Sequence, residues 1–320
     1  MRFGAFVPQG WRLDLGDIPA ESQWDTMVSI GRVAEEVGFE SIWVYDHLHT
    51  WPEISQQPTW EAWTLMAGLA EATERVRLGQ MCTCNSYRPP SYLAKVTACV
   101  DVMSGGRLEV GIGAGWYQHE YEAYGYDFPK ASVRIGQLDE AVQILRKMWT
   151  EDESYFEGKH YTVAGAINRP RPLQDPYPPL WIAGGGEQLT LRVVAKYGDY
   201  ANYFGTPETF RHKTEVLERH CRDVGRDFDE ITLTRNVECL IASDEAELAE
   251  KTEEWAKRMP GSRTIEQYKE TSLYGTPDQV IAQLEETRKL GIDYGIVYFA
   301  DATWGDGMRL FGEQVIPAVG

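Results

Sequence analysis

The 320-residue sequence contains no long hydrophobic run, and no stretch approaches the roughly 18 apolar residues that a membrane-spanning helix needs. Positive charge is scarce, because 31 Lys and Arg face 49 Asp and Glu and leave a formal net charge of −18. This balance argues against nucleic acid and anionic membrane partners, which are bound mainly through Lys and Arg. The opening MRFGAFVPQG has one Arg and an early Pro-Gly break, so we expect no signal peptide.

Cysteine is scarce as well, with five residues in a chain of this length. An odd number of cysteines is typical of reduced thiols, so we expect a cytoplasmic protein without disulfides. Apolar residues make up 43% of the chain and charged residues 25%, which is the composition of a globular protein. These observations together favour a protein that acts on small molecules.

Short β-rich runs alternate with longer helical patterns along the chain. The predicted strands are Arg2–Val7, Ser41–Tyr45, Arg75–Gln80, Arg107–Ile112, Leu180–Ala183, Tyr200–Phe204, Ile231–Leu240 and Tyr294–Phe299. The predicted helices between them are Gln23–Val37, Pro58–Ala72, Ser91–Met103, Arg134–Trp149, Glu187–Lys196, Pro207–Val224 and Thr276–Leu290. Eight such alternations predict a (β/α)₈ barrel forming a single domain over residues 1–320, with a doubly wound open sheet as the alternative.

Two segments interrupt the alternation, after the fourth and the seventh strand. The Pro-rich segment Glu151–Pro179 is predicted to be a loop that crosses the barrel mouth. The highly charged segment Glu245–Leu273 is predicted to be an insertion with a helix near Ala246–Arg258.

The end of the second strand carries the residues Tyr45-Asp46-His47, followed by Trp51. Barrel enzymes keep their chemistry at the carboxyl ends of the strands, and His can exchange a proton near neutral pH. We therefore expect His47 to act in catalysis beside Asp46 and Trp51. His49 faces the other way along an extended chain and is the weaker candidate.

A run of three glycines, Gly184 to Gly186, joins the fifth strand to the next helix at Glu187. Glycines allow a ligand close to the backbone, and a helix N-terminus offers free N–H groups. The pattern predicts a phosphate site at the barrel mouth. The other glycine run, Gly111-Ile-Gly113-Ala-Gly115-Trp116, lacks the third glycine of a Rossmann fingerprint and is interpreted as a tightly packed strand end.

The third strand ends in Met81-Cys82-Thr83-Cys84-Asn85, which suggests a surface that packs against a flat ligand. Two thiols without a further pair are a weak zinc signal, so no metal site is expected. His119-Glu120 is followed by Ala123 where a zinc protease helix would place its second His.

Several segments together resemble the luciferase-like monooxygenase superfamily, and within it the coenzyme F420-dependent oxidoreductases of actinobacteria. They are MRFGAFVPQG, GFESIWVYDHLHTW, RVRLGQMCTCNSYRPPSYLAK, DVMSGGRLEVGIGAGWYQHEYEAYG, RPRPLQDPYPPLWIAGGGEQLTLRVVAKYGDYAN and YGTPDQVIAQLEETRKLGIDYGIVYF. The resemblance runs from the first strand to the last helix. It implies a barrel that holds a deazaflavin (F420) or FMN at its mouth and transfers a hydride to or from a substrate.

The resemblance also implies roles for single residues. Asp46 contacts the cofactor, His47 gives or takes the proton beside the substrate, and Trp51 lines the pocket. A non-proline cis peptide falls at Met81–Cys82 behind the ring, and Cys84, Asn85 and Ala114 line the ring and tail. Gly184, Gly185, Gly186 and Glu187 bind the phosphate, and members are often homodimers.

One departure concerns the sugar-phosphate dehydrogenases of the family, in which a Glu proton donor follows the G-x-G-x-G segment. Trp116 stands there in this chain, with Glu120 a turn later. Trp116, Tyr117 and Trp51 suggest a more apolar or aromatic substrate pocket. The oligoglutamate tail of F420 is anionic, and Arg88, Arg169 and Arg171 are the candidates to hold it at the mouth.

Three functional hypotheses follow. The first is an F420-dependent oxidoreductase acting on a small carbonyl, alcohol, enone or imine. The second is an FMN-dependent monooxygenase that works with a separate flavin reductase. The third is a non-catalytic cofactor-binding barrel.

Overall fold

The computed structural model describes residues 1–258 and 263–320 of the chain. Eight parallel strands form a closed barrel in the order β1-β2-β3-β5-β8-β9-β10-β12, and β12 pairs with β1 through the register Arg2↔Tyr294. The expected (β/α)₈ barrel is therefore confirmed, and the open sheet is excluded. The barrel strands are β1 Arg2–Phe6, β2 Ser41–Val44, β3 Arg77–Gln80, β5 Leu108–Gly113, β8 Leu180–Ala183, β9 Tyr200–Asn202, β10 Thr232–Ile241 and β12 Tyr294–Phe299.

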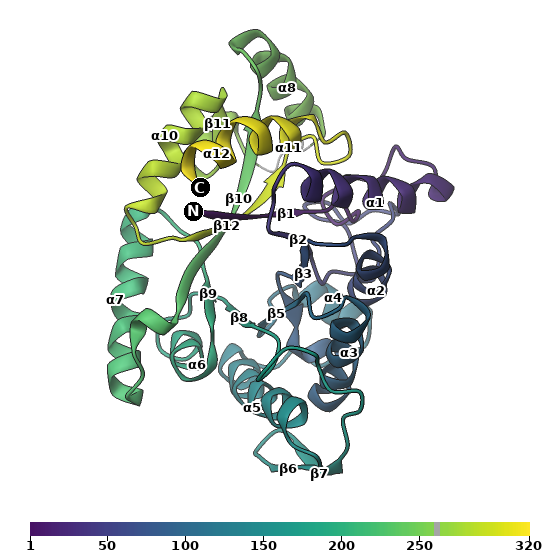
Figure 1. Cartoon of the computed structure of the whole chain (residues 1–320), viewed down its shortest axis with the longest axis vertical. Helices are drawn as coiled ribbons and strands as arrows, with labels where there is room; N and C mark the ends of the chain where they lie inside the picture. The colour runs from purple at the N-terminus through teal and green to yellow at the C-terminus, as the bar shows by residue number, and fades with distance from the viewer. Residues whose placement is uncertain (259–262) are drawn as a thin grey trace.

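The helices surround the barrel on its outside, and the two chain ends lie side by side (Figure 1). The N-terminal amine donates a hydrogen bond to the carbonyl of Val319 at 2.9 Å. No described helix is both long and apolar enough to cross a membrane. The outer helices are α1 Ala20–Glu36, α2 Ala62–Ala72, α3 Pro90–Met103, α5 Ala131–Thr150, α6 Thr190–Tyr197, α7 Pro207–Val224, α10 Pro277–Arg288, α11 Asp306–Leu310 and α12 Ile316–Val319, with a π-helical turn at Phe311–Val315 before α12.

Local sequence signals explain where these helices begin and end. Thr206 caps α7 by accepting a hydrogen bond from the Thr209 N–H, Pro207 occupies the first turn, and Gly225 ends the helix at φ 72°. Thr276 and Gln279 form a capping box at the start of α10. Pro317 lies in the first turn of α12, but the short helices after β12 were not expected from the sequence.

The segment from 151 to 179 differs from the expected mouth-crossing loop. It forms an antiparallel hairpin of β6 (Ser154–Glu157) and β7 (Thr162–Ala166), and β6 packs against α5. Its return limb continues along α3, where the N–H of Leu173 and the amide of Gln174 donate to Asp101. The Gln174 amide also donates to the carbonyl of Leu108 at the amino end of β5. Most of the segment therefore covers the outer wall of the barrel, although the Tyr161 hydroxyl at the hairpin turn accepts a hydrogen bond from Asn85.

The second insertion contains the expected helix, α8 (Glu245–Arg258), followed by α9 (Ile265–Thr271) and β11 (Leu273–Gly275). β11 adds to β10 as an extra parallel strand outside the barrel ring. Figure 1 shows α8 and the β6–β7 hairpin at opposite ends of the molecule. Both insertions thus leave the barrel strands themselves intact.

Aromatic side chains fill the barrel interior toward the amino ends of the strands. Trp43, Trp181 and Tyr294 are buried there, and Trp181 stacks on Tyr200 with ring centroids 4.0 Å apart. The Trp181 indole donates to the buried carboxylate of Glu109 at 2.6 Å, and Arg77 pairs with the same carboxylate. This end is a closed floor, so chemistry is confined to the opposite end, the carboxyl ends of the strands.

Candidate active site

His47 lies at the barrel mouth, just beyond the end of β2. Successive residues of an extended chain point to opposite sides, and Tyr45 and His47 share one side. Both rings contact Trp11, which follows β1: the Trp11 and His47 rings stack at 4.1 Å with an interplanar angle of 6°. Trp51 continues this aromatic row, 5.9 Å from Trp11. Trp11 therefore separates His47 from Trp51.

A buried carboxylate holds the imidazole of His47. Glu120, on the short helix α4 (Gln118–Ala123), places its Oε2 2.9 Å from His47 Nδ1, and its side chain is 0% exposed. The hydroxyl of Tyr87, in a 3-10 turn at Asn85–Tyr87, donates to the same oxygen at 2.7 Å. The backbone N–H groups of Leu48 and His49 donate to Oε1 at 2.6 and 2.9 Å. Glu120 is thus fixed from four directions.

These donors determine the charge of Glu120. Burial alone would raise its pKa, but the hydrogen bonds from His47, Tyr87 and the His49 N–H outweigh burial and lower the pKa. An ionised carboxylate can only accept a hydrogen bond, here from Nδ1–H, which assigns that tautomer to neutral His47. Nε2 of His47 has no hydrogen-bond partner among residues 1–258 and 263–320. That nitrogen is the one available for proton exchange.

The two aromatic residues after the Gly115 turn complete the surroundings of His47. Trp116 and Tyr117 approach the imidazole edge-on, with ring centroids at 5.9 and 5.8 Å. They stack on each other at 5.1 Å, and 58% of Trp116 is exposed. The sequence grouped Trp51 with Trp116 and Tyr117, but in the structure Trp116 and Tyr117 lie next to His47, whereas Trp51 lies beyond Trp11.

Asp46 points away from His47 and into the wall of the barrel. Arg88 binds its carboxylate with two hydrogen bonds, at 2.7 and 3.0 Å, and the Cys84 N–H donates to it at 2.8 Å. Arg88 also pairs with Glu61 at 2.6 Å. Burial would lower the Arg88 pKa, but Asp46 and Glu61 raise it. Asp46 therefore links the ends of β2 and β4 (Thr83–Cys84), and the carboxylate beside His47 is Glu120 instead.

The third strand ends in the cis peptide bond between Met81 and Cys82 that the resemblance implied. Behind it the packing is tight, since a Cβ on Gly113 would lie 2.6 Å from the Cys82 sulfur. Burial raises the pKa of both thiols, that of Cys84 to about 12, so they are neutral at physiological pH. These residues form a neutral wall, and a buried neutral thiol neither attacks nor ligates.

Asn85 continues this wall and is buried. Its amide NH₂ donates to the Tyr161 hydroxyl at 3.2 Å, whereas its Oδ1 has no partner among the described residues. Ala114, which directly follows β5, is half-buried. An unsatisfied buried acceptor at a barrel mouth is unusual and fits a ligand donor.

The glycine loop after β8 is open, with Gly184 and Gly186 exposed and Gly184 at φ 117°. The N–H groups of Gly185, Gly186 and Glu187 have no acceptor within the described residues. α6 begins at Thr190 rather than at Glu187, so a turn separates the glycines from the helix. Lys213 of α7 lies over the loop, because a Cβ on Gly185 would be 2.5 Å from its Nζ. The loop and Lys213 together make a cradle for an anion.

The arginines expected at the mouth lie elsewhere or are already paired. Arg169 and Arg171 both contact Asp152, which follows the end of α5 distant from the mouth. Arg88 is at the mouth but is engaged by Asp46 and Glu61. The expectation that these three residues form a basic strip at the mouth is wrong, and a cation that does lie over the glycine loop is Lys213.

The sequence reasoning missed Trp11 and the contact of Glu120 with His47. Trp11 was open to prediction, because it follows the Pro-Gly break at the carboxyl end of β1. The Glu120 contact depends on where α4 lies after the Gly115 turn, and neither periodicity nor spacing indicates that position. The glycine loop and His47 stand on β8 and β2, which are three strand intervals apart, about 14 Å at the usual spacing.

A closed barrel with a histidine, a buried carboxylate and an open anion cradle at its mouth defines the chain as a (β/α)₈-barrel enzyme. The luciferase-like monooxygenase family matches residues 1–263. The chain belongs to this family and is an oxidoreductase.

Individual proteins agree with that assignment. A protein of Gordonia bronchialis named F420-dependent glucose-6-phosphate dehydrogenase is 32% identical over 80% of this chain and 75% of its own length. The pyrimidine monooxygenase RutA of Stutzerimonas stutzeri is 27% identical over 95% of this chain and 81% of its own. The solved structure of an F420-dependent secondary alcohol dehydrogenase with an F420-acetone adduct superposes with a TM-score of 0.84. It is 24% identical, covers 100% of this chain and 99% of its own, and supports the fold.

Proposed function

We propose that this enzyme is an F420-dependent oxidoreductase that transfers a hydride between the deazaflavin and a small carbonyl, alcohol, enone or imine. The single observation that carries the proposal is the His47–Glu120 pair, with Nδ1 held at 2.9 Å and Nε2 free at the mouth. When bound, F420 supplies or accepts two electrons as a hydride and reacts poorly with oxygen. The relatives named F420-dependent, at up to 33% identity, support this choice of cofactor.

The residues around the mouth fit such a group. The free N–H groups of Gly185, Gly186 and Glu187 and the ammonium of Lys213 would hold its phosphate. The neutral wall of Met81, Cys82 and Cys84 suits an uncharged ring face. The buried Oδ1 of Asn85, which lacks a donor, would accept a hydrogen bond from the ring or its hydroxylated tail. In this proposal Asp46 acts by fixing Cys84 and Arg88, and Ala114 lines the same wall.

His47 is proposed as the proton donor and acceptor. Because Nδ1–H points to Glu120, a neutral His47 presents a lone pair on Nε2 and can remove the proton of a substrate hydroxyl. In the reducing direction the protonated ring returns that proton to the substrate oxygen, and the ionised Glu120 stabilises the positive charge in between. Glu120 itself does not donate the proton, because its own donors lower its pKa.

The surroundings of His47 favour an apolar or aromatic substrate. Trp11, Trp116 and Tyr117 surround the imidazole, and Trp51 lies one ring beyond. Some relatives are named for glucose 6-phosphate, but in this chain Trp116 occupies the position after the G-x-G-x-G segment. Aromatic rings bind flat apolar groups well, which is the basis for expecting such a substrate.

An FMN-dependent monooxygenase working with a separate flavin reductase is the second candidate. The observations that favour it are the family itself and the relative named pyrimidine monooxygenase RutA. The same cradle and wall would hold FMN, since both cofactors carry three fused rings and a phosphate. The two candidates differ in cofactor affinity and in oxygen consumption.

The test is a titration of the purified protein with F420 and, separately, with FMN, followed by cofactor fluorescence. We expect saturable binding of F420 that is at least tenfold tighter than that of FMN, and no oxygen consumption with reduced F420. Preferential FMN binding together with oxygen uptake in the presence of a flavin reductase would replace the first candidate by the second. A protein that bound neither cofactor would contradict both.

A further inference from the structure

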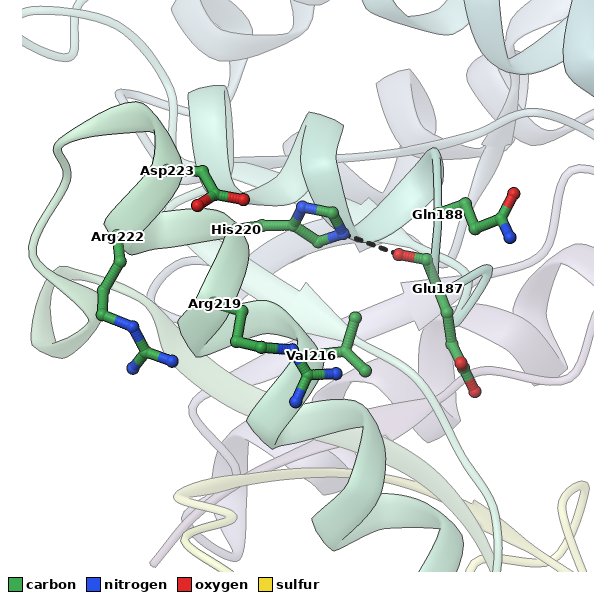
Figure 2. Close-up of a pocket in the computed structure, with 7 residues that line it drawn as sticks. All are labelled: Glu187, Gln188, Val216, Arg219, His220, Arg222 and Asp223. Carbon is green, nitrogen blue, oxygen red and sulfur yellow. Dashed lines mark hydrogen bonds between the residues drawn. The ribbon is translucent and has the colours of Figure 1, made fainter.

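Two clusters of charged side chains differ in their balance of charge. A groove of about 500 Å³ lies outside the barrel, between the turn at Glu187 and helix α7 (Figure 2). Its cationic lining residues are Arg219 and Arg222, and its acidic ones are Glu187 and Asp223. These charges cancel, so the groove favours neither an anion nor a cation. The second cluster lies at the barrel mouth and is not balanced in this way.

The mouth cluster is centred on Glu238, near the carboxyl end of β10. Glu238 is in register with Tyr298 of β12, which belongs to the buried aromatic cluster inside the barrel. Arg12, in the loop after β1, donates to one oxygen of the Glu238 carboxylate at 2.6 Å, and Arg263 donates to the other. One carboxylate thus holds two guanidinium groups.

A second acid and a third arginine complete the cluster. Asp14 accepts hydrogen bonds from the Gly10 N–H at 2.6 Å and from the Tyr298 hydroxyl at 3.1 Å. Arg258, at the end of α8, donates to the carbonyl of Ala300. Burial raises the pKa of Asp14, and the charge of Arg258 opposes this rise. Three guanidinium groups therefore share two carboxyl groups, in a chain whose net charge is −18.

Several buried donors of this cluster have no acceptor among the described residues. Arg12 is 8% exposed, and its Nε is without an acceptor. The Nε of Arg258 and the indole N–H of Trp11 are likewise buried and unpaired. The Tyr268 hydroxyl is a further unpaired group, on a ring 4.6 Å from the Arg263 guanidinium. Buried donors are normally hydrogen-bonded, so several unpaired ones in one place favour an acceptor supplied by a ligand.

The aromatic row at the mouth connects this cluster to His47. The Cζ of Arg12 lies 4.9 Å from the Trp51 ring and 5.6 Å from the Trp11 ring. Trp11 stacks on His47 at 4.1 Å. A small molecule that lies along these rings can therefore contact the imidazole at one end and the guanidinium at the other.

We propose that Arg12 binds a carboxylate of the substrate, so that the substrates are apolar or aromatic carboxylic acids whose reacting carbon lies away from the carboxylate. This inference rests on the proposed function and adds the polar group that the aromatic rings do not recognise. The guanidinium fork matches the two oxygens of a carboxylate. The surplus of one guanidinium over the carboxyl groups matches a monoanion. Glu238 is a positioning residue, because it holds the Arg12 side chain in place.

The experiment compares binding of 3-phenylpropanoate with binding of its neutral isostere 3-phenylpropanamide. Isothermal titration calorimetry of the purified protein is carried out alone and in the presence of F420. We expect the carboxylate to bind roughly 10- to 100-fold more tightly, because a hydrogen bond between two ionised groups is stronger than one to a neutral amide. Added salt should change that ratio little, since buried pairs are screened less than exposed ones.

Variants assign the preference to Arg12. Arg12→Gln should reduce the affinity for the carboxylate to that for the amide and leave the amide unchanged, while Glu238 keeps Arg263 as its partner. Arg12→Lys keeps the charge without the fork and should restore only part of the preference. The matched control is Arg211→Gln, which removes an exposed positive charge on α7 and should change neither affinity.

The outcomes separate this inference from the proposed function. Equal affinity of the wild type for both probes, or binding of neither, would overturn the carboxylate site, whatever the F420 titration shows. A preference that persists in Arg12→Gln, or that Arg211→Gln also abolishes, would overturn it as well. If Arg12→Gln does not fold, Arg12→Lys and the wild type decide. A carboxylate preference in a protein that binds no F420 would overturn the proposed function and leave the carboxylate site.

Discussion

Two buried glutamates, one at each end of the barrel, show how the same residue type is given opposite protonation. Glu109 at the closed floor receives a hydrogen bond from the Trp181 indole and pairs with Arg77. Burial exceeds both interactions and raises the Glu109 pKa to about 7. Glu120 at the mouth is equally enclosed, yet its pKa is lowered.

The number and direction of donors account for this difference. Glu120 accepts hydrogen bonds from His47, from Tyr87 and from two consecutive backbone N–H groups, so both of its oxygens are satisfied. Backbone donors are fixed by the fold and need no side-chain ordering, which makes them efficient stabilisers of a carboxylate. Glu109 has no backbone donor among the described residues, and its pKa is raised. Of these two buried glutamates, the one that keeps its negative charge is therefore the one that contacts an imidazole.

The largest expected effect comes from removing the imidazole itself. His47→Ala should lower turnover by roughly 10²–10⁴, because general acid–base catalysis contributes about that factor. F420 affinity should stay within twofold, since the phosphate cradle lies on β8 and the His47 ring on β2. The measurement is steady-state turnover alongside a fluorescence titration of the cofactor.

A second variant at this position distinguishes loss of catalysis from misfolding. His47→Asn keeps a polar planar side chain next to Trp11 and should show the same loss of turnover with an unchanged circular dichroism spectrum. Full activity in either variant would contradict the assignment of the proton donor. Loss of activity together with loss of cofactor binding would indicate a structural role instead.

The next largest effect concerns Glu109, at the floor, and is measured as a change in the free energy of unfolding. Its pKa rises from 4.5 unfolded to about 7 folded, so the folded state binds more protons between these values. Stability from this group is fully present below pH 4.5 and is lost as the pH rises through 7, a change of about 3 kcal/mol. Glu109→Gln should abolish this component, which urea unfolding between pH 5 and 8 would measure.

Glu120, at the mouth, should make stability depend on pH in the opposite direction in the same experiment. The lowered pKa of Glu120 contributes stability above its unfolded value, and that stability is lost as the pH falls through the folded pKa. The free energy of unfolding of the wild type, relative to that of Glu120→Gln, should therefore increase with rising pH. Relative to that of Glu109→Gln, it should decrease. If the free energies of unfolding of the two variants changed with pH in the same way, the assignment of opposite pKa shifts to Glu109 and Glu120 would be contradicted.

Glu120→Gln should also reduce turnover, by roughly 10- to 100-fold, the size of effect found for carboxylates that orient a metal-bound histidine. The cause is loss of the charge that stabilises protonated His47, so the pH profile of turnover should shift along with the rate. In the double variant His47→Ala/Glu120→Gln the two losses should not add, since Glu120 acts through His47. Additive losses would give Glu120 a separate role.

The barrel was predictable because its strands are set by local pattern. Each of the eight predicted strands overlaps an observed one, and Leu180–Ala183 and Tyr294–Phe299 match in full. Buried strands are read from runs of apolar residues alone, and helix ends from caps such as Thr206 and Gly225. The hairpin Ser154–Ala166 was missed because the flanking prolines dominate its segment and its own strands are short.

The candidate site was predictable only in part. Strand ends indicate His47 and the glycine loop, because position on a strand decides which residues reach the mouth. The partners come from segments outside the barrel strands: Glu120, on the short helix α4, reaches His47 after the turn at Gly115, and Asp46 is held by Arg88, 42 residues away. Spacing in the sequence does not indicate how those segments pack against the strand ends.

The smallest effect tests whether the donors to Glu120 act one by one. Tyr87→Phe removes only the hydroxyl that donates to Oε2 at 2.7 Å and leaves the His47 and backbone donors in place. We expect the Glu120 pKa to rise, turnover to fall roughly 2- to 5-fold, and stability to drop by about 1 kcal/mol, the usual net value of one hydrogen bond. The pH profile of turnover should shift in the same direction as in Glu120→Gln but by less. A loss as large as that in Glu120→Gln would mean that the four donors act as one cooperative unit, and no loss at all would assign the ionised state of Glu120 to its backbone donors alone.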